Sequence, residues 1–490
     1  MRSITDLYRP SLALLTDLYQ LTMAYGYWQR GRAQDEAVFH LYFRRNPFAG
    51  GYTICAGLAY VIDLVRSFAF EDEDIDYLRT LDGNDGKPLF EESFFSYLRN
   101  LDLNVELDAI PEGTAVFPQE PLLRVTGPLL LCQLLETPLL NMINFQSLIA
   151  TKAARICQVA KGEQILDFGL RRAQGIDGAI SASRAAYIGG CDATSNVLAG
   201  RLLGIPVRGT HAHSWIMAFD DEPTAFEAYA DAMPNNCVFL VDTYDSLAGV
   251  NNAIAQGRLL REAGHEMVGI RLDSGDLAEL SIEARKLLDR AGFKDAVIIA
   301  SNDLDEYAIA ELKQRGAPIA VWGVGTKLVT AYDEPALGGV YKLAAIRHQG
   351  AAWQYKMKLS DDAGKSSIPG ILQVRRYSRQ QSFVADMIFD ETKVVPGRPI
   401  IVDLLGNQRN KRMGADEPYA DLLVPVFRSG QQVYDIPQLA DIRRRVGVQL
   451  DNLDTGVKRI TDSKPYLCGL EEGLAEQTGK LASTLVNLKA

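Results

Sequence analysis

The segment MVGIRLDSGDLAELSIEARKLLDRAGFKDAVIIASN, residues 267–302, decides the fold class. It begins and ends with runs rich in Val and Ile, at 267–273 and 296–302, that lack the alternation of a half-exposed strand. Such near-continuous apolar runs are typical of parallel strands covered on both faces. Between them, residues 277–292 place Leu and Ile at helical spacing and end in glycine, as a capped helix does. The segment is therefore predicted to be a strand–helix–strand unit.

The same pattern recurs along the middle of the chain. Apolar runs followed by helix-like segments or polar turns stand at 164–170, 205–211, 237–243, 267–273, 296–302 and 319–325. A series of βα units indicates either a barrel or a doubly wound sheet. Before this region the sequence predicts a mixed segment with aromatic alternation at 38–43 and an acidic helical stretch at 71–92. After it, the sequence predicts a mobile loop at 356–370, strands near 371–374 and 399–403, and a charged helical section from about residue 439.

Composition excludes several classes of function. Subtracting 62 acidic from 51 basic residues gives a net charge of −11, which argues against general binding to nucleic acid or to anionic membranes. The six cysteines form no CxxC pair, so they suggest neither a zinc site nor a redox motif, and they fit a reducing compartment. The apolar stretch 127–150 holds too many polar residues to span a membrane, and the N-terminus lacks a secretory apolar region. The sequence predicts a cytoplasmic protein without a resident metal site.

Polar or glycine-rich residues follow each of the six runs. In a βα barrel, functional groups gather at the carboxyl ends of the strands. Arg271 and Asp273 alternate along one predicted strand and therefore share a face. There the guanidinium could clamp phosphate oxygens, and the carboxylate could accept from ribose hydroxyls or hold a metal-bound water. An Arg–Asp pair that merely neutralises itself is the alternative.

Two further strand ends carry candidate groups. Gly323, Gly325 and Thr326 end the last run, where successive amides and a hydroxyl can hold a phosphate, with a plain tight turn as the alternative. His211 and His213 follow another run, a position where histidine often acts as acid–base, nucleophile or donor. A metal pair is disfavoured because no third ligand stands at metal-site spacing.

The N-terminal block TDLYQLTM, residues 16–23, is predicted to begin a helix. Thr16 could be its N-cap, and Leu18, Leu21 and Met23 could form an apolar face. That interpretation leaves Tyr19 unexplained, and the flat ring of Tyr19 could stack on an aromatic ligand.

Blocks spread over nearly the whole chain resemble the nicotinate phosphoribosyltransferase family. They are TDLYQLTMAYGYW (16–28), FGLRRAQGIDGAISASRAAYIGGCDATSNVLAG (168–200), GTHAHSW (209–215), LVDTYDS (240–246), GIRLDSGDL (269–277), GVGTKL (323–328), KMKLSDDAGKSSIPG (356–370) and PYLCGLEEGLAE (465–476). Each block alone is weak, but together, in the family's order, they are highly specific.

The resemblance implies a fold and an assembly. The expected fold is an incomplete, TIM-like α/β barrel at 146–345, packed against an N-terminal α+β domain at 1–145. Residues 346–490 would return to that domain and end in a C-terminal helical extension. The family works as a homodimer, in which the N-terminal domain of one subunit reaches the barrel mouth of the other.

The resemblance also implies a reaction. Nicotinate and phosphoribosyl pyrophosphate would give nicotinate mononucleotide and pyrophosphate in NAD salvage, with Mg²⁺ present. ATP would be a co-substrate, hydrolysed through a phosphorylated histidine. The position before Ser214 and Trp215 implies that this histidine is His213, whereas His211 stands where the family varies.

The implied roles of the reaction centre follow from the same motifs. Arg271 would neutralise the leaving pyrophosphate, and Asp273 would meet ribose hydroxyls or metal-bound water. Ser274 and Gly275 would bind substrate beside them. Arg171 would bind either the nicotinate carboxylate or the phosphates.

The two ends of the substrate would meet other motifs. Gly323, Gly325 and Thr326 would hold the 5′-phosphate. Phe168 and Tyr19 would sandwich the pyridine ring, with Tyr19 supplied by the partner subunit.

Three other readings remain. Nicotinamide phosphoribosyltransferase has the same fold and a similar histidine, but the TDLYQLTM and GTHAHSW blocks favour the nicotinate form. Quinolinate phosphoribosyltransferase would be shorter, with more basic groups for a second carboxylate. A barrel that binds nucleotides without turning them over, such as a regulator, would be distinguished by the absence of pyrophosphate release.

Overall fold

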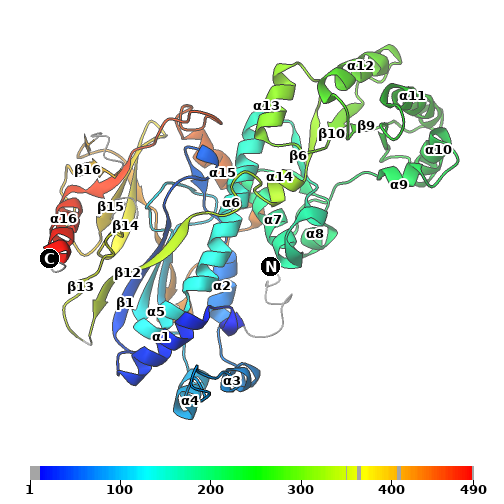
Figure 1. The fold of residues 1–490 in the computed structure, drawn as a ribbon. Coiled ribbons are helices and arrows are strands. Elements are labelled where there is room, and N and C mark those ends of the chain that lie inside the picture. The colour runs from blue at the N-terminus through cyan, green and yellow to red at the C-terminus, as the bar shows by residue number, and fades with distance from the viewer. Residues whose placement is uncertain (1–11, 349, 361–365, 405–409, 488–490) are drawn as a thin grey trace. The chain divides into compact units, whose positions relative to one another are not determined.

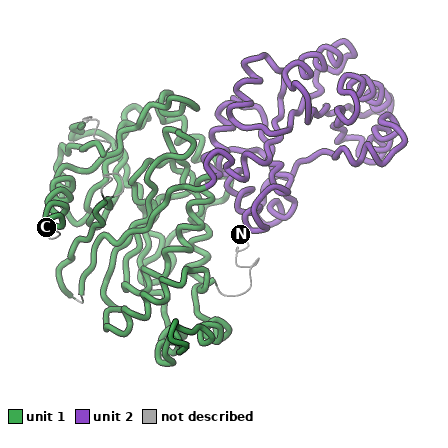
Figure 2. The backbone as a smooth tube through the Cα atoms, in the orientation of Figure 1, with its two compact units in different colours: residues 1–148, 336–490 green, residues 149–335 purple. Residues whose placement is uncertain are grey.

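A computed structural model describes residues 12–348, 350–360, 366–404 and 410–487. The chain forms two compact units (Figure 2): unit 1 comprises residues 1–148 and 336–490, and unit 2 comprises residues 149–335. Helix α6 (Glu136–Ala160) belongs to both, because the boundary falls within it. No described helix is both long and apolar enough to cross a membrane.

Unit 1 contains two large sheets (Figure 1). The first has the order β13-β12-β1-β5-β3-β19-β20, with antiparallel neighbours throughout. Its strands are β1 (Glu36–Phe43), β3 (Glu106–Ala109), β5 (Leu123–Pro128), β12 (Gly339–Arg347), β13 (Gln354–Tyr355), β19 (Val424–Arg428) and β20 (Gln431–Gln432). The predicted mixed segment at 38–43 is thus part of a strand, and seven of the eight residues of β1 are buried.

The second sheet of unit 1 has the order β17-β16-β21-β15-β14-β18. Its strands are β14 (Leu372–Arg379), β15 (Ser382–Asp390), β16 (Ile400–Asp403), β17 (Lys411–Arg412), β18 (Tyr419–Asp421) and β21 (Cys468–Glu471). Among the described strands of this sheet, only β15 and β21 pair in parallel. The strands predicted near 371–374 and 399–403 are confirmed as β14 and β16. A short pair, β2 (Thr53–Ile54) and β4 (Ala115–Val116), stands apart.

Helices complete unit 1. They are α1 (Leu18–Gln29), α2 (Leu58–Ser67), α3 (Asp72–Arg79), α4 (Glu92–Arg99), α5 (Leu129–Leu134), α15 (Leu439–Asp451) and α16 (Glu472–Asn487), with 3-10 turns η2 (Leu12–Leu14) and η3 (Pro47–Ala49). The helical section predicted from residue 439 is confirmed. The helix predicted over 71–92 is wrong beyond Arg79, because Asp82 bridges to Pro88 around Gly86, whose φ is +71°. In the loop predicted at 356–370, residues 361–365 lie outside the described residues, and the rest form no helix or strand.

A buried ion pair joins two strands of the second sheet. The Nε of Arg376 on β14 donates to Asp386 on β15 at 2.9 Å, and Tyr466 donates to the same carboxylate at 3.0 Å. Arg376 and Asp386 are 3% and 0% exposed. Burial, together with the neighbouring Asp386 carboxylate, raises the pKa of Glu120 well above its usual value. Arg376 is therefore the cation that balances Asp386.

We expect Arg376→Met to lower the free energy of unfolding by about 3–5 kcal/mol, since it leaves the Asp386 charge buried without a cation beside it. Urea unfolding followed by circular dichroism measures the change. The control is Arg444→Met, whose pair with Asp441 is largely exposed, and which should cost at most about 1 kcal/mol. Equal losses in the two variants would contradict the expectation.

Unit 2 is built on one parallel sheet of six strands. The order is β7-β6-β11-β10-β9-β8, and every neighbouring pair is parallel. The strands are β6 (Gln164–Asp167), β7 (Ala193–Thr194), β8 (Val238–Leu240), β9 (Gly269–Leu272), β10 (Val297–Ala300) and β11 (Val321–Val324). Leu166, Ala193, Val238, Ile299 and Val321 from five of these strands form a buried cluster, as expected of a sheet that is apolar on both faces.

Helices alternate with these strands. They are α7 (Gly175–Gly189), α8 (Val197–Leu203), α9 (His213–Ile216), α10 (Glu222–Ala232), α11 (Ser246–Glu262), α12 (Leu277–Arg290), α13 (Glu306–Gln314) and α14 (Thr326–Val329), with the 3-10 turn η4 (Leu170–Arg172). The predicted strand–helix–strand unit at 267–302 is confirmed as β9, α12 and β10. Gly292 follows α12 with a φ of +84°, which explains the glycine there.

The strand predicted at 205–211 is wrong. Only Val207 makes a bridge, to Thr194, and the chain then continues without regular structure to α9. Two backbone bonds join the segment to Thr194: the Thr194 amide donates to the Pro206 carbonyl at 3.0 Å, and the Arg208 amide donates to the Thr194 carbonyl at 3.1 Å. The edge of the sheet is formed by the two-residue strand β7 instead.

Candidate active site

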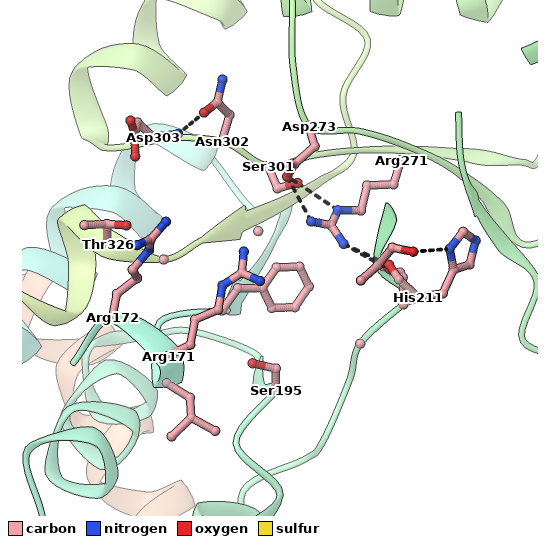
Figure 3. Close-up of a pocket in the computed structure, with 17 residues that line it drawn as sticks. Arg171, Arg172, Ser195, His211, Arg271, Asp273, Ser301, Asn302, Asp303 and Thr326 are labelled. Carbon is pink, nitrogen blue, oxygen red and sulfur yellow. Dashed lines mark hydrogen bonds and ion pairs between the residues drawn. The ribbon is translucent and has the colours of Figure 1, made fainter. Parts of the chain in front are cut away.

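A cavity of about 390 Å³ lies in unit 2 at the carboxyl ends of the parallel strands (Figure 3). It is lined by Phe168, Leu170, Arg171, Arg172, Ser195, Gly209, Thr210, His211, Ala212, Arg271, Asp273, Ser301, Asn302, Asp303, Gly323, Gly325 and Thr326. Among the predicted site residues, the lining includes Phe168, Arg171, Arg271, Asp273, Gly323, Gly325 and Thr326, and does not include Tyr19, His213, Ser274 or Gly275. The location is where open and closed parallel α/β sheets both bind ligands.

Arg271 on β9 is held in one orientation at the cavity wall. Its Nε donates to Ser301 at 2.8 Å, Nη1 donates to Thr210 at 2.9 Å and Nη2 donates to Asp273 at 2.9 Å. The guanidinium carbon lies 5.5 Å from the centre of the Phe168 ring. Since each guanidinium nitrogen has a fixed partner, the planar group is positioned before any ligand arrives.

Asp273 is an ionised carboxylate in this cavity. Burial alone would raise its pKa, but the Ser301 hydroxyl and the charge of Arg271 bring the pKa of Asp273 below its usual value. Its side chain remains 25% exposed. Arg271 and Asp273 therefore form an ion pair, and both residues line the cavity.

His213, the first residue of α9, is tied to the same region through Asp242. Its Nε2 lies 3.2 Å from Oδ1 of Asp242, a carboxylate just after β8 whose side chain is 1% exposed. The other oxygen of Asp242 accepts from the Asp273 amide at 2.8 Å and from the Ser274 hydroxyl at 2.6 Å. One buried carboxylate thus links the histidine to the segment that carries Arg271. The His213 side chain is 38% exposed.

His211 is engaged differently. It is 8% exposed, and its Nε2 accepts from the backbone amide of Leu240 at 3.3 Å. Burial, reinforced by the positive charge of Arg271, lowers the pKa of His211 to about 4. The ring is therefore neutral at pH 7 and anchors the loop before α9 to β8.

The buried Asp167 at the end of β6 shapes the segment that carries Phe168 and Arg171. Its Oδ1 accepts from the Gly169 amide at 2.9 Å, and its Oδ2 accepts from the hydroxyls of Ser183 and Thr194, both at 2.8 Å. These bonds turn the chain sharply after the strand. Arg171 follows within η4, where its exposed side chain reaches the cavity (Figure 3).

The two glycines of the GVGT segment pack against Phe168. A Cβ added to Gly323, which lies within β11, would stand 2.6 Å from two carbons of the Phe168 ring. A Cβ on Gly325 would stand 3.3 Å from the Phe168 carbonyl oxygen. Gly325 then leads into α14, and Thr326, the first residue of this helix, lines the cavity. Gly323 is therefore a strand glycine that makes room for an aromatic ring, and the plain-turn alternative is wrong for it.

Tyr19 lies in unit 1, on α1, and is 48% exposed. The helix begins one residue later than the predicted cap: Asp17 is the N-cap, and Thr16 instead donates to Gln20 at 2.6 Å. The predicted apolar face is also wrong. Of its three members only Leu21 is buried, while Leu18 and Met23 are 53% and 40% exposed.

Several residues of the site were missed by sequence reasoning. Asp242 and Ser301 stand near the ends of the predicted runs 237–243 and 296–302, but no spacing rule singles them out. Asn302 has a φ of +110°, unusual for a residue other than glycine, and such strain often marks a functional segment. In the described parts of the chain no group of three or more His, Cys, Asp or Glu residues could hold a metal ion by itself.

Comparison with known proteins covers almost the entire chain. Residues 14–144 match the nicotinate phosphoribosyltransferase N-terminal domain, residues 163–387 match the nicotinate phosphoribosyltransferase family, and residues 373–478 match its C-terminal domain. The nicotinate phosphoribosyltransferase of Bacillus subtilis is 45% identical over 94% of this chain and 93% of its own length. The Homo sapiens protein of the same name is 38% identical over 96% of each chain.

The fold agrees with these matches. The crystal structure of human nicotinic acid phosphoribosyltransferase superposes with a TM-score of 0.83 at 36% identity, covering 95% of this chain and 99% of that one. Fold and site together define a mixed α/β enzyme with a ligand cavity at the carboxyl ends of a parallel sheet. The chain belongs to the nicotinate phosphoribosyltransferase family.

Proposed function

We propose that this enzyme joins nicotinate to the ribose of phosphoribosyl pyrophosphate in NAD salvage. The products are nicotinate mononucleotide and pyrophosphate, and ATP is hydrolysed to ADP and phosphate. The observation that carries the proposal is the pre-positioned Arg271–Asp273 pair, linked through Asp242 to an accessible His213, in a chain of this family.

Arg271 is proposed to bind the pyrophosphate as it leaves. Displacement at the anomeric carbon passes through an oxocarbenium-like state, as glycoside cleavage does. The departing group takes both electrons of the C–O bond, so a fixed guanidinium facing it stabilises the transition state more than the ground state. Asp273 is ionised and paired with Arg271, and it is placed to accept hydrogen bonds from ribose hydroxyls.

The cavity residues fit a magnesium ion brought in with the substrate. Mg²⁺ is usually held by one or two carboxylates together with substrate phosphates and water. Asp273 and Asp303 line the cavity and would hold it, directly or through water. When bound, the ion would neutralise charge on the pyrophosphate.

His213 is proposed to accept the phosphoryl group of ATP. Because Asp242 faces Nε2, that nitrogen is oriented as the donor, and Nδ1 keeps the free lone pair for attack on phosphorus. The phosphorylated ring would add negative charge beside the Arg271 segment, which couples ATP use to substrate affinity.

The base is proposed to lie against Phe168. Tyr19 of the partner subunit would cover its other face, and this shared site requires a homodimer. Arg171 lines the same cavity with an exposed guanidinium and would meet the nicotinate carboxylate or a phosphate. Gly323, Gly325 and Thr326 would hold the 5′-phosphate, with Ser274 and Gly275 behind Asp273.

The larger architecture is proposed to follow the family. The open six-stranded sheet of unit 2 would be an incomplete TIM-like barrel spanning 146–345. Residues 1–145 would form the N-terminal α+β domain, and residues 346–490 would complete and extend it. We also propose a cytoplasmic location.

We expect Gly323→Ala to raise the KM for nicotinate by about tenfold, because the added methyl group displaces the Phe168 ring that receives the base. Steady-state kinetics with nicotinate varied at saturating phosphoribosyl pyrophosphate measures it. Gly178→Ala on α7, where a Cβ meets nothing within 4 Å, is the control and should behave as wild type. An unchanged KM in Gly323→Ala would refute the assignment of Phe168 to the base.

The central experiment offers nicotinate and nicotinamide in parallel to the purified protein with phosphoribosyl pyrophosphate, Mg²⁺ and ATP. Mononucleotide from nicotinate, increased by ATP, is the expected result. Turnover of nicotinamide instead would assign the protein to the sister activity. Release of no pyrophosphate with either base would leave a nucleotide-binding protein.

A further inference from the structure

The segments that follow β10 and β11 are joined behind the cavity by an ion pair that the reaction does not use. The Nζ of Lys327 lies 2.6 Å from Oδ2 of Asp305. Lys327 follows the cavity residue Thr326 directly, and Asp305 stands two residues after the cavity residue Asp303. Neither Lys327 nor Asp305 lines the cavity. The pair therefore supports the wall from the outside.

Asp305 fixes two helix starts at once. Its Oδ1 accepts from the backbone amides of Tyr307 at 3.0 Å and Ala308 at 2.7 Å, which makes it the N-cap of α13. Burial would raise its pKa, but the Ala308 amide and Lys327 hold the pKa of Asp305 below its usual value, so it remains a carboxylate. The first turn of α14 is thus tied to the first turn of α13.

Helix α13 is itself anchored firmly within unit 2. Glu306, 0% exposed, receives Lys152 at 2.7 Å and Arg155 at 2.8 Å, both from α6. Lys152 also lies 2.5 Å from Asp333, which follows α14. Breaking a buried ion pair of this kind costs much free energy, so the start of α13 is held in place relative to α6.

The segment between β10 and α13 needs such support. Asn302 has a φ of +110° and its side-chain oxygen accepts from the Asp303 amide at 2.9 Å. A non-glycine residue in this conformation is strained and persists only where its surroundings hold it. Asp305, clamped by Lys327, holds the far end of this segment.

We propose that Lys327, through its ion pair with Asp305, is a positioning residue that sets the phosphate-binding end of the cavity. It acts on affinity for phosphoribosyl pyrophosphate and not on affinity for the base. The inference rests on the proposed function, since it assigns the Thr326 end of the cavity to the sugar phosphate. Neither residue touches substrate; both act through the backbone that carries Thr326 and Asp303.

The test compares Lys327→Met and Lys327→Arg in the full-length protein. In Lys327→Met the KM for phosphoribosyl pyrophosphate should rise by roughly tenfold or more, because small misplacements of binding groups weaken binding strongly. The KM for nicotinate and kcat should stay within about twofold, since the base end and the reacting groups are untouched. Lys327→Arg keeps the charge opposite Asp305 and should recover most of the affinity.

A second pair of variants separates positioning from stability. Asp305→Asn keeps an oxygen to cap α13 but loses the charge, so it should reproduce the KM change even if Lys327→Met folds poorly. Lys313→Met is the matched control. Lys313 lies on α13, the helix that Asp305 caps, and its Nζ lies 2.5 Å from Glu163. Its side chain is 22% exposed, close to the 27% of Lys327. It should lower the melting temperature without changing either KM.

Titration calorimetry with phosphoribosyl pyrophosphate alone gives a readout that does not depend on turnover. Weaker binding in Lys327→Met and Asp305→Asn, with wild-type binding in Lys313→Met, supports the inference. Unchanged binding in both variants, or equal losses in kcat and both KM values, overturns it. The wild-type assay is independent: if the unaltered protein makes no mononucleotide from nicotinate, the proposed function fails instead.

Discussion

His213→Ala is expected to abolish the stimulation of mononucleotide synthesis by ATP while leaving a slow, ATP-independent synthesis. The reason is that His213 is the proposed phosphoryl acceptor and its side chain is 38% exposed, whereas His211 is buried, neutral and bonded to the backbone of β8. At limiting phosphoribosyl pyrophosphate the rate should fall by about one to two orders of magnitude, the usual size of a coupling between two ligands. Rates with and without ATP, together with transfer of label from γ-labelled ATP, measure it.

His265→Ala is the matched control for this experiment. His265 is also in unit 2, and its ring is bonded only to the exposed side chain of Asn235 in the described structure. It should keep full ATP stimulation and full labelling. Retention of ATP-stimulated synthesis in His213→Ala would show that the phosphoryl group goes elsewhere.

Arg271→Met is expected to lower kcat/KM by about 10²–10³, because it removes the fixed cation that is proposed to face the leaving pyrophosphate. Arg271→Lys should recover only part of this, since an ammonium cannot reproduce the fork that reaches Ser301, Thr210 and Asp273 together. Steady-state kinetics with phosphoribosyl pyrophosphate varied measures both variants.

The control is Arg261→Met. Arg261 also pairs with a carboxylate, Glu266, and lies over an aromatic ring, Phe293 at 4.3 Å, but on the exposed surface of unit 2. It should retain wild-type kcat/KM. A loss in Arg271→Met no larger than that in Arg261→Met would mean that the Arg271–Asp273 pair only neutralises itself.

Sequence reasoning predicted the parallel sheet well, because burial on both faces leaves a strong local signal in runs such as those of β9 and β10. It failed at 205–211, where the run is apolar but pairs with the sheet at Val207 alone and contains Pro206, a residue found in sheets chiefly at edges. It also misplaced the start of α1 by one residue, since Thr16 and Asp17 are both good caps and only the three-dimensional neighbours decide between them.

The site was predicted less completely than the sheet. Polar strand ends identify which edge of a parallel sheet binds ligand, and Arg271 and Asp273 followed from alternation along one strand. Asp242 could not be found in this way. One oxygen of Asp242 accepts from the Asp273 amide and the Ser274 hydroxyl, and the other lies beside Nε2 of His213. Because these partners are 29 to 32 positions away in the sequence, no local pattern reveals them.

The packing of Phe168 over Gly323 has a consequence for how this family can change. An alanine at 323 is tolerable only if the ring at 168 becomes smaller or moves, and a smaller ring at 168 leaves a void unless 323 gains a methyl group. The two positions, distant in sequence, should therefore substitute together across evolution. Directed evolution toward bulkier bases should meet the same restriction, and libraries that randomise residues 168 and 323 jointly should yield active variants that single-site libraries miss.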